Sequence, residues 1–135
     1  ALFRELGPVI TGLMLAARWL GRPLRARVTG VDLSRQLADL AARQGYRLFL
    51  LGAAPGVAQR AANRLVADYP ALQIAGVHAG SPDPAEEASI IRIILAAAPH
   101  ILLVAYGAPA QDKWIARNLR RLGVPVCMGV GGALD

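Results

Sequence analysis

The run Ile101-Leu102-Leu103-Val104-Ala105 decides the fold, because it is apolar at every position and is soon followed by the turn residues Gly107-Ala108-Pro109. A short apolar run bounded by Gly and Pro indicates a strand. Since no position in it is polar, the run is typical of a strand that is covered on both faces. We therefore expect this strand to lie in the interior of a sheet.

On both sides of this run, apolar strand-like segments alternate with amphipathic helical segments. Alternation at this spacing implies right-handed crossovers between parallel strands. The sequence thus predicts an α/β fold, a Rossmann-like parallel sheet with helices on both faces, in a single domain over residues 1–135. Further strands are expected at 46–51, 72–77 and 125–128, and helices at 12–21, 31–44, 57–69, from 83 until Pro99, and from the Gly107 turn to Leu122.

The helix that begins at Asp83-Pro84-Ala85-Glu86 carries a capping pattern. Asp83 is expected as the N-cap, Pro84 as the first helical residue and Glu86 as the residue that completes a capping box. The apolar positions of this helix follow a helical period and predict its buried face. They are Ile90, Ile91, Ile94 and Leu95.

The composition of the 135 residues excludes several classes of protein. Apolar residues make up 55% and charged residues 18%, which excludes a disordered chain. Cys127 is the single cysteine, so an intramolecular disulfide and a cysteine-ligated zinc site are both excluded. Cys127 itself is expected to be a small buried hydrophobe.

Hydropathy and charge predict a cytoplasmic protein. Residues 93–111 carry no charge, but Pro99, Gly107 and Pro109 interrupt them, and the uncharged run 6–17 is too short to span a bilayer. No signal-peptide pattern is present. The formal net charge of +6 permits anionic partners without indicating one, and no nucleic-acid partner is expected.

A ligand site is expected where the predicted strands end, because ligands of parallel α/β sheets bind at the carboxyl ends of the strands. The segments that follow the predicted strands are all rich in Gly or Pro. Their motifs are incomplete, since the segment 52–56 lacks the second glycine of the dinucleotide-binding fingerprint and Leu134 stands where its third glycine belongs. NAD or ATP binding is therefore disfavoured, and by motif alone these are ordinary turns. The segments are 52–56, 78–82, 107–111 and 129–135.

The segment Thr29-Gly30-Val31-Asp32 has two interpretations. Thr29 and Asp32 have the spacing of a capping box that opens the helix at 31–44. The pattern by itself favours this capping interpretation, and in the functional interpretation Asp32 is a general base beside the preceding cationic residues. Spacing does not separate the two, and both can hold at once.

Gln111 also has two interpretations, because it lies in the first turn after the buried strand. A neutral amide there could contact a sugar or base hydroxyl, or a phosphate oxygen. In the alternative, the turn is solvated, Asp112 complements the helix dipole and Trp114 packs in the core.

The two histidines give little support for a metal site. His78 lies at a predicted strand exit and is a weak site candidate, whereas His100 is expected at the surface where a strand begins. The sequence contains no HxxxH, HExxH or Asp-x-Asp motif. Since Mg²⁺-dependent sugar-nucleotide enzymes normally offer such carboxylates, we expect no metal cofactor.

Three segments, taken together, resemble one protein family. They are 27–33 (Arg-Val-Thr-Gly-Val-Asp-Leu), 107–115 (Gly-Ala-Pro-Ala-Gln-Asp-Lys-Trp-Ile) and 129–135 (Gly-Val-Gly-Gly-Ala-Leu-Asp). In this order and spacing they are similar to the WecG/TagA/CpsF glycosyltransferases, family 26 of the sugar transferases. The resemblance covers residues 12–135.

This resemblance implies an inverting glycosyltransferase. Members transfer a sugar, typically N-acetylmannosamine or its uronic acid, from a UDP-sugar to a polyprenyl-diphosphate-linked sugar. They do so at the inner membrane surface, in the synthesis of teichoic-acid linkage units, enterobacterial common antigen or exopolysaccharide. The donor is thus a substrate, and no cofactor is implied.

The resemblance also implies a role for individual residues. Asp32 falls on the family's proposed base for the acceptor hydroxyl, with Thr29 beside it in the same motif. Gln111 is expected at the sugar donor. The other substrate-binding residues implied are Gly107, Ala108, Pro109, Gly129, Gly131, Gly132 and Asp135.

The sequence departs from the family at several positions. Ala26 stands where members usually carry Glu, and Val9-Ile10 where they carry Asp-Gly. Members also have an amino-terminal strand, and a basic carboxyl-terminal appendage beyond the position of Asp135. We therefore expect a fragment that is inactive by itself. The alternative function is a non-catalytic nucleotide-binding Rossmann-like domain; an NAD-type oxidoreductase is disfavoured by the broken fingerprints.

Overall fold

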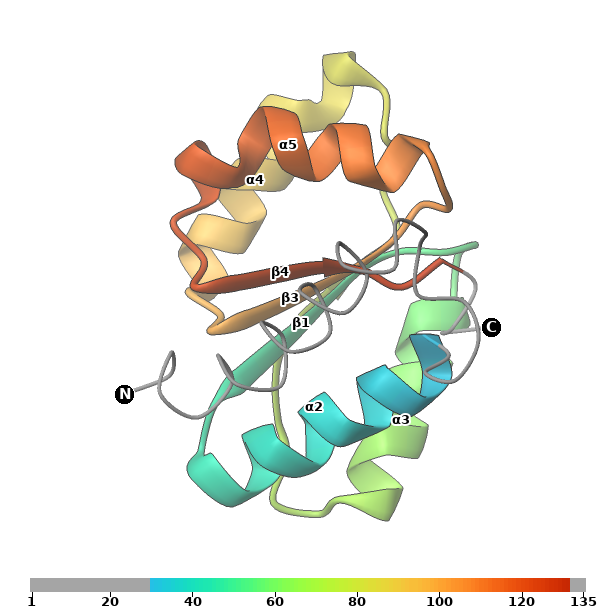
Figure 1. Ribbon diagram of the computed structural model, residues 1–135, viewed down its shortest axis with the longest axis vertical. Helices are drawn as coiled ribbons and strands as arrows, with labels where there is room; N and C mark the ends of the chain where they lie inside the picture. Colours follow the sequence, from blue (N-terminus) through green and yellow to red (C-terminus); the bar gives the residue numbers. More distant parts are fainter. Residues whose placement is uncertain (1–29, 132–135) are drawn as a thin grey trace, which may run out of the picture.

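A computed structural model describes residues 30–131 of the protein (Figure 1). Helices and strands alternate along this part of the chain, as the sequence predicts. The predicted helix at 12–21 lies outside the described residues. The elements are α2 (Gly30–Gln44), β1 (Arg47–Gly52), α3 (Val57–Asp68), β2 (Gln73–His78), a 3-10 turn (Pro84–Glu86), α4 (Glu87–Ala97), β3 (Ile101–Ala105), α5 (Ala110–Leu122) and β4 (Val126–Gly129).

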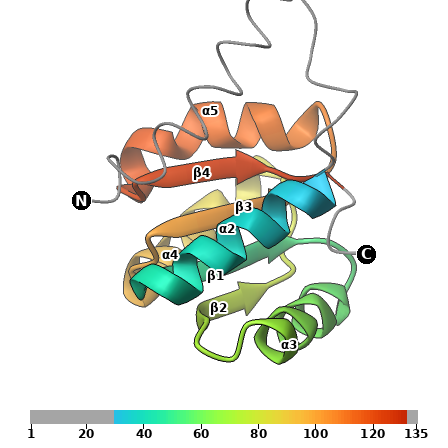
Figure 2. The ribbon, with the colours of Figure 1, turned by 60° about the horizontal axis from the view of Figure 1, so that its bottom comes forward.

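Within the described residues, the strands form one parallel sheet in the order β2-β1-β3-β4. β3 pairs with β1, where Leu103 lies opposite Leu50, and with β4, where Leu103 lies opposite Met128. Helices α2 and α3 cover one face of the sheet, and α4 and α5 cover the other (Figures 1 and 2). The predicted α/β fold, a Rossmann-like parallel sheet with helices on both faces, is confirmed.

The core is built around β3, whose bounds match the predicted run and whose residues are all buried. Leu103 packs in the cluster formed with α2 and α3, whereas Leu102 and Val104 pack in the cluster formed with α4 and α5. β1 alternates in the same way, with Leu50 on the first face and Phe49 on the second. Each such buried side chain contributes roughly 1.5–3 kcal/mol, so the two central strands hold both helix layers.

The helix predicted to begin at Asp83 differs from expectation at its start. Asp83 does cap the chain, since its Oδ1 accepts a hydrogen bond from the Ala85 N–H at 3.0 Å. The N–H of Asp83 donates to Ser81 Oγ at 3.1 Å, so the predicted capping box with Glu86 is wrong. A 3-10 turn results, and the α-helix begins only at Glu87.

The buried face of α4 is correctly predicted except at one position. Ile90, Ile91 and Ile94 are buried, but Leu95 is 52% exposed. Leu95 follows Ile94 directly and is therefore turned about 100° away from it around the helix axis. The expectation that Leu95 is buried is wrong for that reason.

His100 joins the starts of β1 and β3 at the amino edge of the sheet. Its Nδ1 accepts a hydrogen bond from the Arg47 N–H at 3.0 Å, and its own N–H donates to Arg47 O at 2.9 Å. Desolvation, and then the Arg47 charge, lower the pKa of His100 below its usual value of 6.5. The neutral imidazole is thus the form that the fold requires, because a protonated Nδ1 cannot accept.

We predict that His100 makes the fold less stable in mild acid. The pKa of His100 is lower in the folded than in the unfolded state, so the unfolded state binds the proton first. The contribution of neutral His100 to the free energy of unfolding is complete above pH 6.5. It is lost as the pH falls below 6.5 and through the lower pKa of the folded state. His100→Asn keeps an acceptor near the Nδ1 position and removes the titration. Urea unfolding between pH 7.5 and 5 should show a smaller loss of stability for the variant; equal losses would contradict this role.

We also predict that the thiol of Cys127 reacts slowly in the folded protein. Cys127 lies in β4 and packs against the cluster formed with α4 and α5, and burial raises the pKa of its thiol to about 11. Because the thiolate is the reactive form, only about one molecule in 10³ is reactive at pH 8. Ellman's reagent should label Cys127 slowly in the folded protein and quickly in 6 M guanidinium. Equally fast labelling in both would show that Cys127 is not protected.

Candidate functional site

The turns that follow β1, β3 and β4 lie side by side at the carboxyl edge of the sheet. The Ala53 N–H donates to Ala105 O at 3.0 Å, and the Val130 N–H donates to Val104 O at 2.9 Å. Gly52 permits the first contact, because a Cβ there would lie 2.8 Å from the Ala105 carbonyl carbon. The predicted convergence of the glycine-rich turns at one edge is therefore confirmed for the described residues.

Gln111 connects the turns after β3 and β4. Its side chain is only 7% exposed, and its Oε1 accepts hydrogen bonds from the N–H groups of Gly107 and Gly131, each at 3.0 Å. The interpretation of residue 111 as part of a solvated turn is thus wrong. In the same interpretation, the packing of Trp114 in the core is confirmed.

Gly129 makes the position of Gln111 possible. A Cβ at residue 129 would lie 2.7 Å from Gln111 Nε2 and 2.8 Å from Gln111 Cδ, so any side chain there would displace the Gln111 carboxamide from this position. Gly107 and Gly131 are favoured at their positions for a different reason, because both have a positive φ (81° and 57°), which other residues rarely adopt. Their N–H groups already have Gln111 as partner, so in this structure they are not free donors for a phosphate.

Two helix amino ends lie at the same edge and lack a side-chain cap. Gly56 precedes α3, whose first turn contains no acidic residue. Pro109 precedes α5, whose first turn contains Asp112. The N–H groups of such uncapped first turns carry partial positive charge and favour an anion. Of the two, the amino end of α3 is the better anion site, because no carboxylate competes there.

The amino end of α2 reaches the same edge. α2 ends at Gln44, just before β1 begins at Arg47, so the helix runs back along the sheet from the carboxyl edge (Figure 2). Asp32 therefore belongs to a helical turn near the other turns of the site. Its side chain, with Thr29, Gly132 and Asp135, lies outside the described part of the chain, so its role as base or cap stays a prediction.

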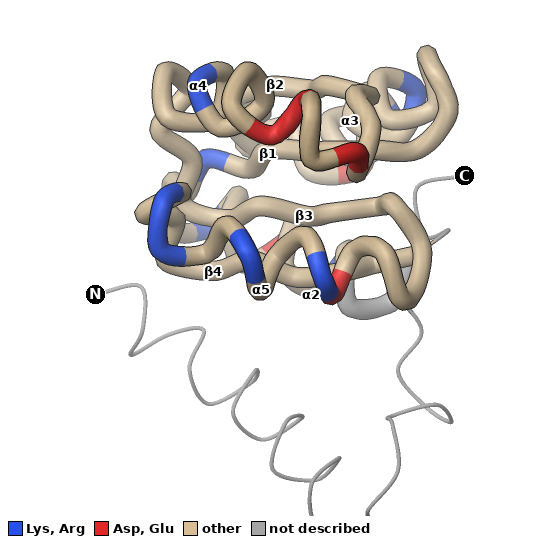
Figure 3. Tube along the Cα trace, turned by 90° about the horizontal axis from the view of Figure 1, so that it is seen from above, with Lys and Arg blue, Asp and Glu red and all other residues tan. Residues whose placement is uncertain are grey.

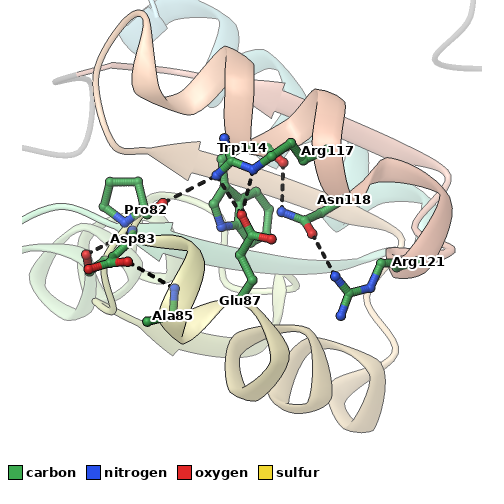
Figure 4. A network of polar contacts seen from close by, with 9 residues as sticks. Pro82, Asp83, Ala85, Glu87, Trp114, Arg117, Asn118 and Arg121 are labelled. Atoms are coloured by element: carbon green, nitrogen blue, oxygen red, sulfur yellow. Dashed lines mark hydrogen bonds and ion pairs between the residues drawn. The ribbon is translucent and has the colours of Figure 1, made fainter.

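A polar network behind the edge joins α4, α5 and the segment after β2 (Figure 4). Arg117 pairs with the buried carboxylate of Glu87 at 2.6 Å and also donates to Pro82 O at 3.4 Å. Asn118, also buried, donates to Trp114 O at 2.9 Å and accepts from Arg121. Sequence analysis did not identify the contact between Glu87 and Arg117 or the burial of Asn118. The one available signal was a polar Asn118 four positions after Trp114, on the apolar side of α5.

The histidines and acidic residues of the described region are dispersed. His78 is the last residue of β2 and lies at the carboxyl edge of the sheet, whereas His100 lies at the opposite, amino edge. Residues 30–131 contain no group of three His, Cys, Asp or Glu side chains that could hold a metal ion. Within the same residues, no helix has both the length and the apolar character that crossing a membrane requires.

Comparison with known proteins identifies the family. The model of the glycosyl transferase WecG/TagA/CpsF family matches residues 9–135, and the chain belongs to this family. The N-acetylglucosaminyldiphosphoundecaprenol N-acetyl-beta-D-mannosaminyltransferase of Bacillus spizizenii is 32% identical to this chain over 124 residues. The aligned segment covers 92% of this chain. The chain is also 34% identical over 125 residues, or 93% of its length, to the protein of the same name from Staphylococcus aureus. In both cases the chain spans about half of the relative's length (48%).

We predict that Gln111 and Gly129 are energetically coupled. Gly129→Ala should displace Gln111 and lower the free energy of unfolding by about 1–3 kcal/mol, and Gln111→Ala should lower it similarly by leaving two N–H groups unpaired. In the double variant the methyl group at 129 meets no amide, so the losses should not add. Chemical unfolding of the wild type, the two single variants and the double variant measures the coupling. Gln59→Ala, at an exposed position of α3, serves as the control. Additive losses would show that the contact is unimportant.

Proposed function

We propose that the chain forms the nucleotide-sugar-binding core of an inverting glycosyltransferase. It would take N-acetylmannosamine, or a related sugar, from a UDP-sugar and transfer it to a polyprenyl-diphosphate-linked sugar in cell-surface polysaccharide synthesis. The observation that carries this proposal is the family match over residues 9–135, which includes every turn at the carboxyl edge of the sheet. The names of the relatives, which specify a mannosaminyl group and a diphosphoundecaprenol acceptor, support the choice of substrates.

Each part of the carboxyl edge has a task in this proposal. The first turn of α2 supplies Asp32, which takes the proton of the acceptor hydroxyl. The uncapped amino end of α3 faces the diphosphate. Gln111 holds the turns after β3 and β4 at a constant spacing, with its Nε2 left as the group that can contact the donor. Gln111 is thus first a positioning residue and only secondarily a ligand contact.

A membrane surface is the natural location of this reaction, because the proposed acceptor is a lipid. Exposed cations lie along α5 (Figure 3), namely Lys113, Arg120 and Arg121, whereas Arg117 is already paired with Glu87. Each cation near an anionic bilayer contributes about 1 kcal/mol, so α5 supports weak surface attachment. We propose a peripheral protein at the inner face of the bacterial plasma membrane. The alternative of a non-catalytic nucleotide-binding domain has no support among the relatives, and turnover would exclude it.

We predict that turnover depends on the carboxylate of Asp32. In the natural protein that contains this sequence, Asp32→Asn should leave UDP-sugar affinity nearly unchanged and lower the turnover rate by about 10²–10⁴, the usual effect of removing a general base. The matched control is Asp39→Asn on the same helix, where Asp39 pairs with Arg43 on the surface. Sugar transfer to a short-chain polyprenyl-diphosphate-sugar measures turnover. If Asp32→Asn retains full turnover, Asp32 is a cap and not the base.

We further predict that the reaction needs no divalent metal. Backbone N–H groups at helix amino ends, together with Arg, would stabilise the diphosphate leaving group. Transfer should continue in EDTA at the rate seen without it. Loss of transfer in EDTA and its recovery with Mg²⁺ or Mn²⁺ would overturn this prediction.

A further inference from the structure

Arg117, on α5, contacts the segment between β2 and α4 at two points (Figure 4). Its Nη2 lies 2.6 Å from Oε1 of Glu87, the first residue of α4. The same nitrogen donates to Pro82 O at 3.4 Å. Among residues 30–131, no other hydrogen bond joins residues 80–82 to a helix or strand. The position of this segment therefore depends on Arg117.

The Glu87 carboxylate makes this arrangement specific. Glu87 is only 9% exposed, and Arg117 is its ion-pair partner. Loss of hydration offsets much of the gain from such a pair, so the geometry that it fixes matters as much as the stability that it adds. A guanidinium suits this task because its planar array of N–H donors reaches two acceptors at once. The contacts thus fix α4, α5 and the segment after β2 relative to one another.

The same helix also holds other turns of the candidate site. Gln111, in the first turn of α5, accepts hydrogen bonds from Gly107 and Gly131, in the turns after β3 and β4. Arg117 lies further along α5 and contacts the segment after β2. One helix therefore sets the spacing between three strand exits at the carboxyl edge.

The topology of the sheet indicates where a ligand would lie relative to these exits. From β1 the chain continues through α3 to β2, whereas from β3 it continues through α5, on the opposite face, to β4. Ligands of parallel sheets bind where neighbouring strands send their connections in opposite directions, which here is between β1 and β3. Gly80 borders this point, because a Cβ there would lie 3.1 Å from the hydroxyl of Tyr106, the residue after β3. Gly80 is exposed, so its backbone is accessible.

We propose that Arg117 is a positioning residue for the nucleotide sugar: it holds residues 79–82 where their backbone forms one side of the donor site. This inference rests on the proposed function, because it takes the ligand to be a nucleotide sugar. Arg117 acts through Pro82 and Glu87 and does not touch the donor. Its removal releases the segment after β2 and weakens donor binding, but it removes no group that takes part in the reaction.

The test compares variants of the natural protein that contains this sequence. In Arg117→Met, the KM for UDP-N-acetylmannosamine should rise about 5- to 50-fold while kcat stays within about twofold, because ground-state and transition-state binding weaken equally. Arg117→Lys keeps a positive charge beside Glu87 but lacks the planar guanidinium, so its KM should lie between those of the wild type and Arg117→Met. A fall in kcat at unchanged KM would overturn the inference.

A double variant separates positioning from stability. Arg117→Met alone leaves the Glu87 carboxylate buried without a partner, which should lower the melting temperature. Adding Glu87→Gln removes this buried charge, so the double variant should melt close to the wild type. Its KM should stay raised, because nothing holds Pro82 O. Recovery of KM together with the melting temperature would overturn the inference, since Arg117 would then act through stability alone.

Arg92→Met, at an exposed position of α4, is the matched control and should leave KM and the melting temperature unchanged. An unchanged KM in Arg117→Met, while the wild type transfers sugar, would overturn the inference and leave the proposed function standing. If the wild type neither transfers the sugar nor binds UDP-N-acetylmannosamine in calorimetric titration, the proposed function and this inference fall together.

Discussion

Burial of β3 on both faces is the constraint on which the rest of the structure depends. A strand whose residues are all buried needs a neighbour on each side and a helix layer above and below. Parallel neighbours meet this need only through crossover connections, and each crossover here is a helix that returns the chain to the amino edge. All strands therefore end at one edge, which gathers their turns in one place.

Close approach of the backbone at that edge then selects small residues. Gly52 lies against the carbonyl of Ala105, and Gly129 lies against the amide of Gln111. A Cβ at Gly52 would clash with backbone, and a Cβ at Gly129 would displace the Gln111 carboxamide; of the two, only Gly52 has a positive φ. The glycines thus serve the packing of neighbouring turns, and the carboxamide of Gln111 satisfies two of the N–H groups that those turns leave open. A site built in this way has little freedom to change its spacing when a ligand arrives.

The face of the sheet covered by α4 and α5 contains both a stabilising ion pair and a buried polar group that lowers stability. Glu87 and Arg117 join the two helices, and Arg117 also reaches the segment after β2. Beside this network, the hydroxyl of Tyr106 is buried without a hydrogen-bond partner among residues 30–131. A buried hydroxyl without a partner lowers the stability of the fold, in contrast to the paired groups beside it.

Short-range pattern determined the elements of this protein. The apolar run at 101–105, the helical periods on either side and the Gly and Pro turns predicted the parallel sheet, its two helix layers and the edge where the turns meet. Within the helices and strands, the wrong predictions concern the start of α4 and one of its apolar positions. At Asp83, Ser81 Oγ met the N–H that a capping box would have used, and Leu95 turned away from the core by its position on the helix.

Only the tertiary structure decided what the residues of the candidate site do. Sequence position left Gln111 equally open to ligand binding and to solvent, because its partners, the N–H groups of Gly107 and Gly131, include one that is 20 residues away. The burial of the Tyr106 hydroxyl and the ion pair of Glu87 and Arg117 could not be predicted either, since both depend on which turns and helices become neighbours. A sequence records the chemistry of each side chain, but hydrogen bonding and burial depend on distances in space, which only the packed sheet and its helices define.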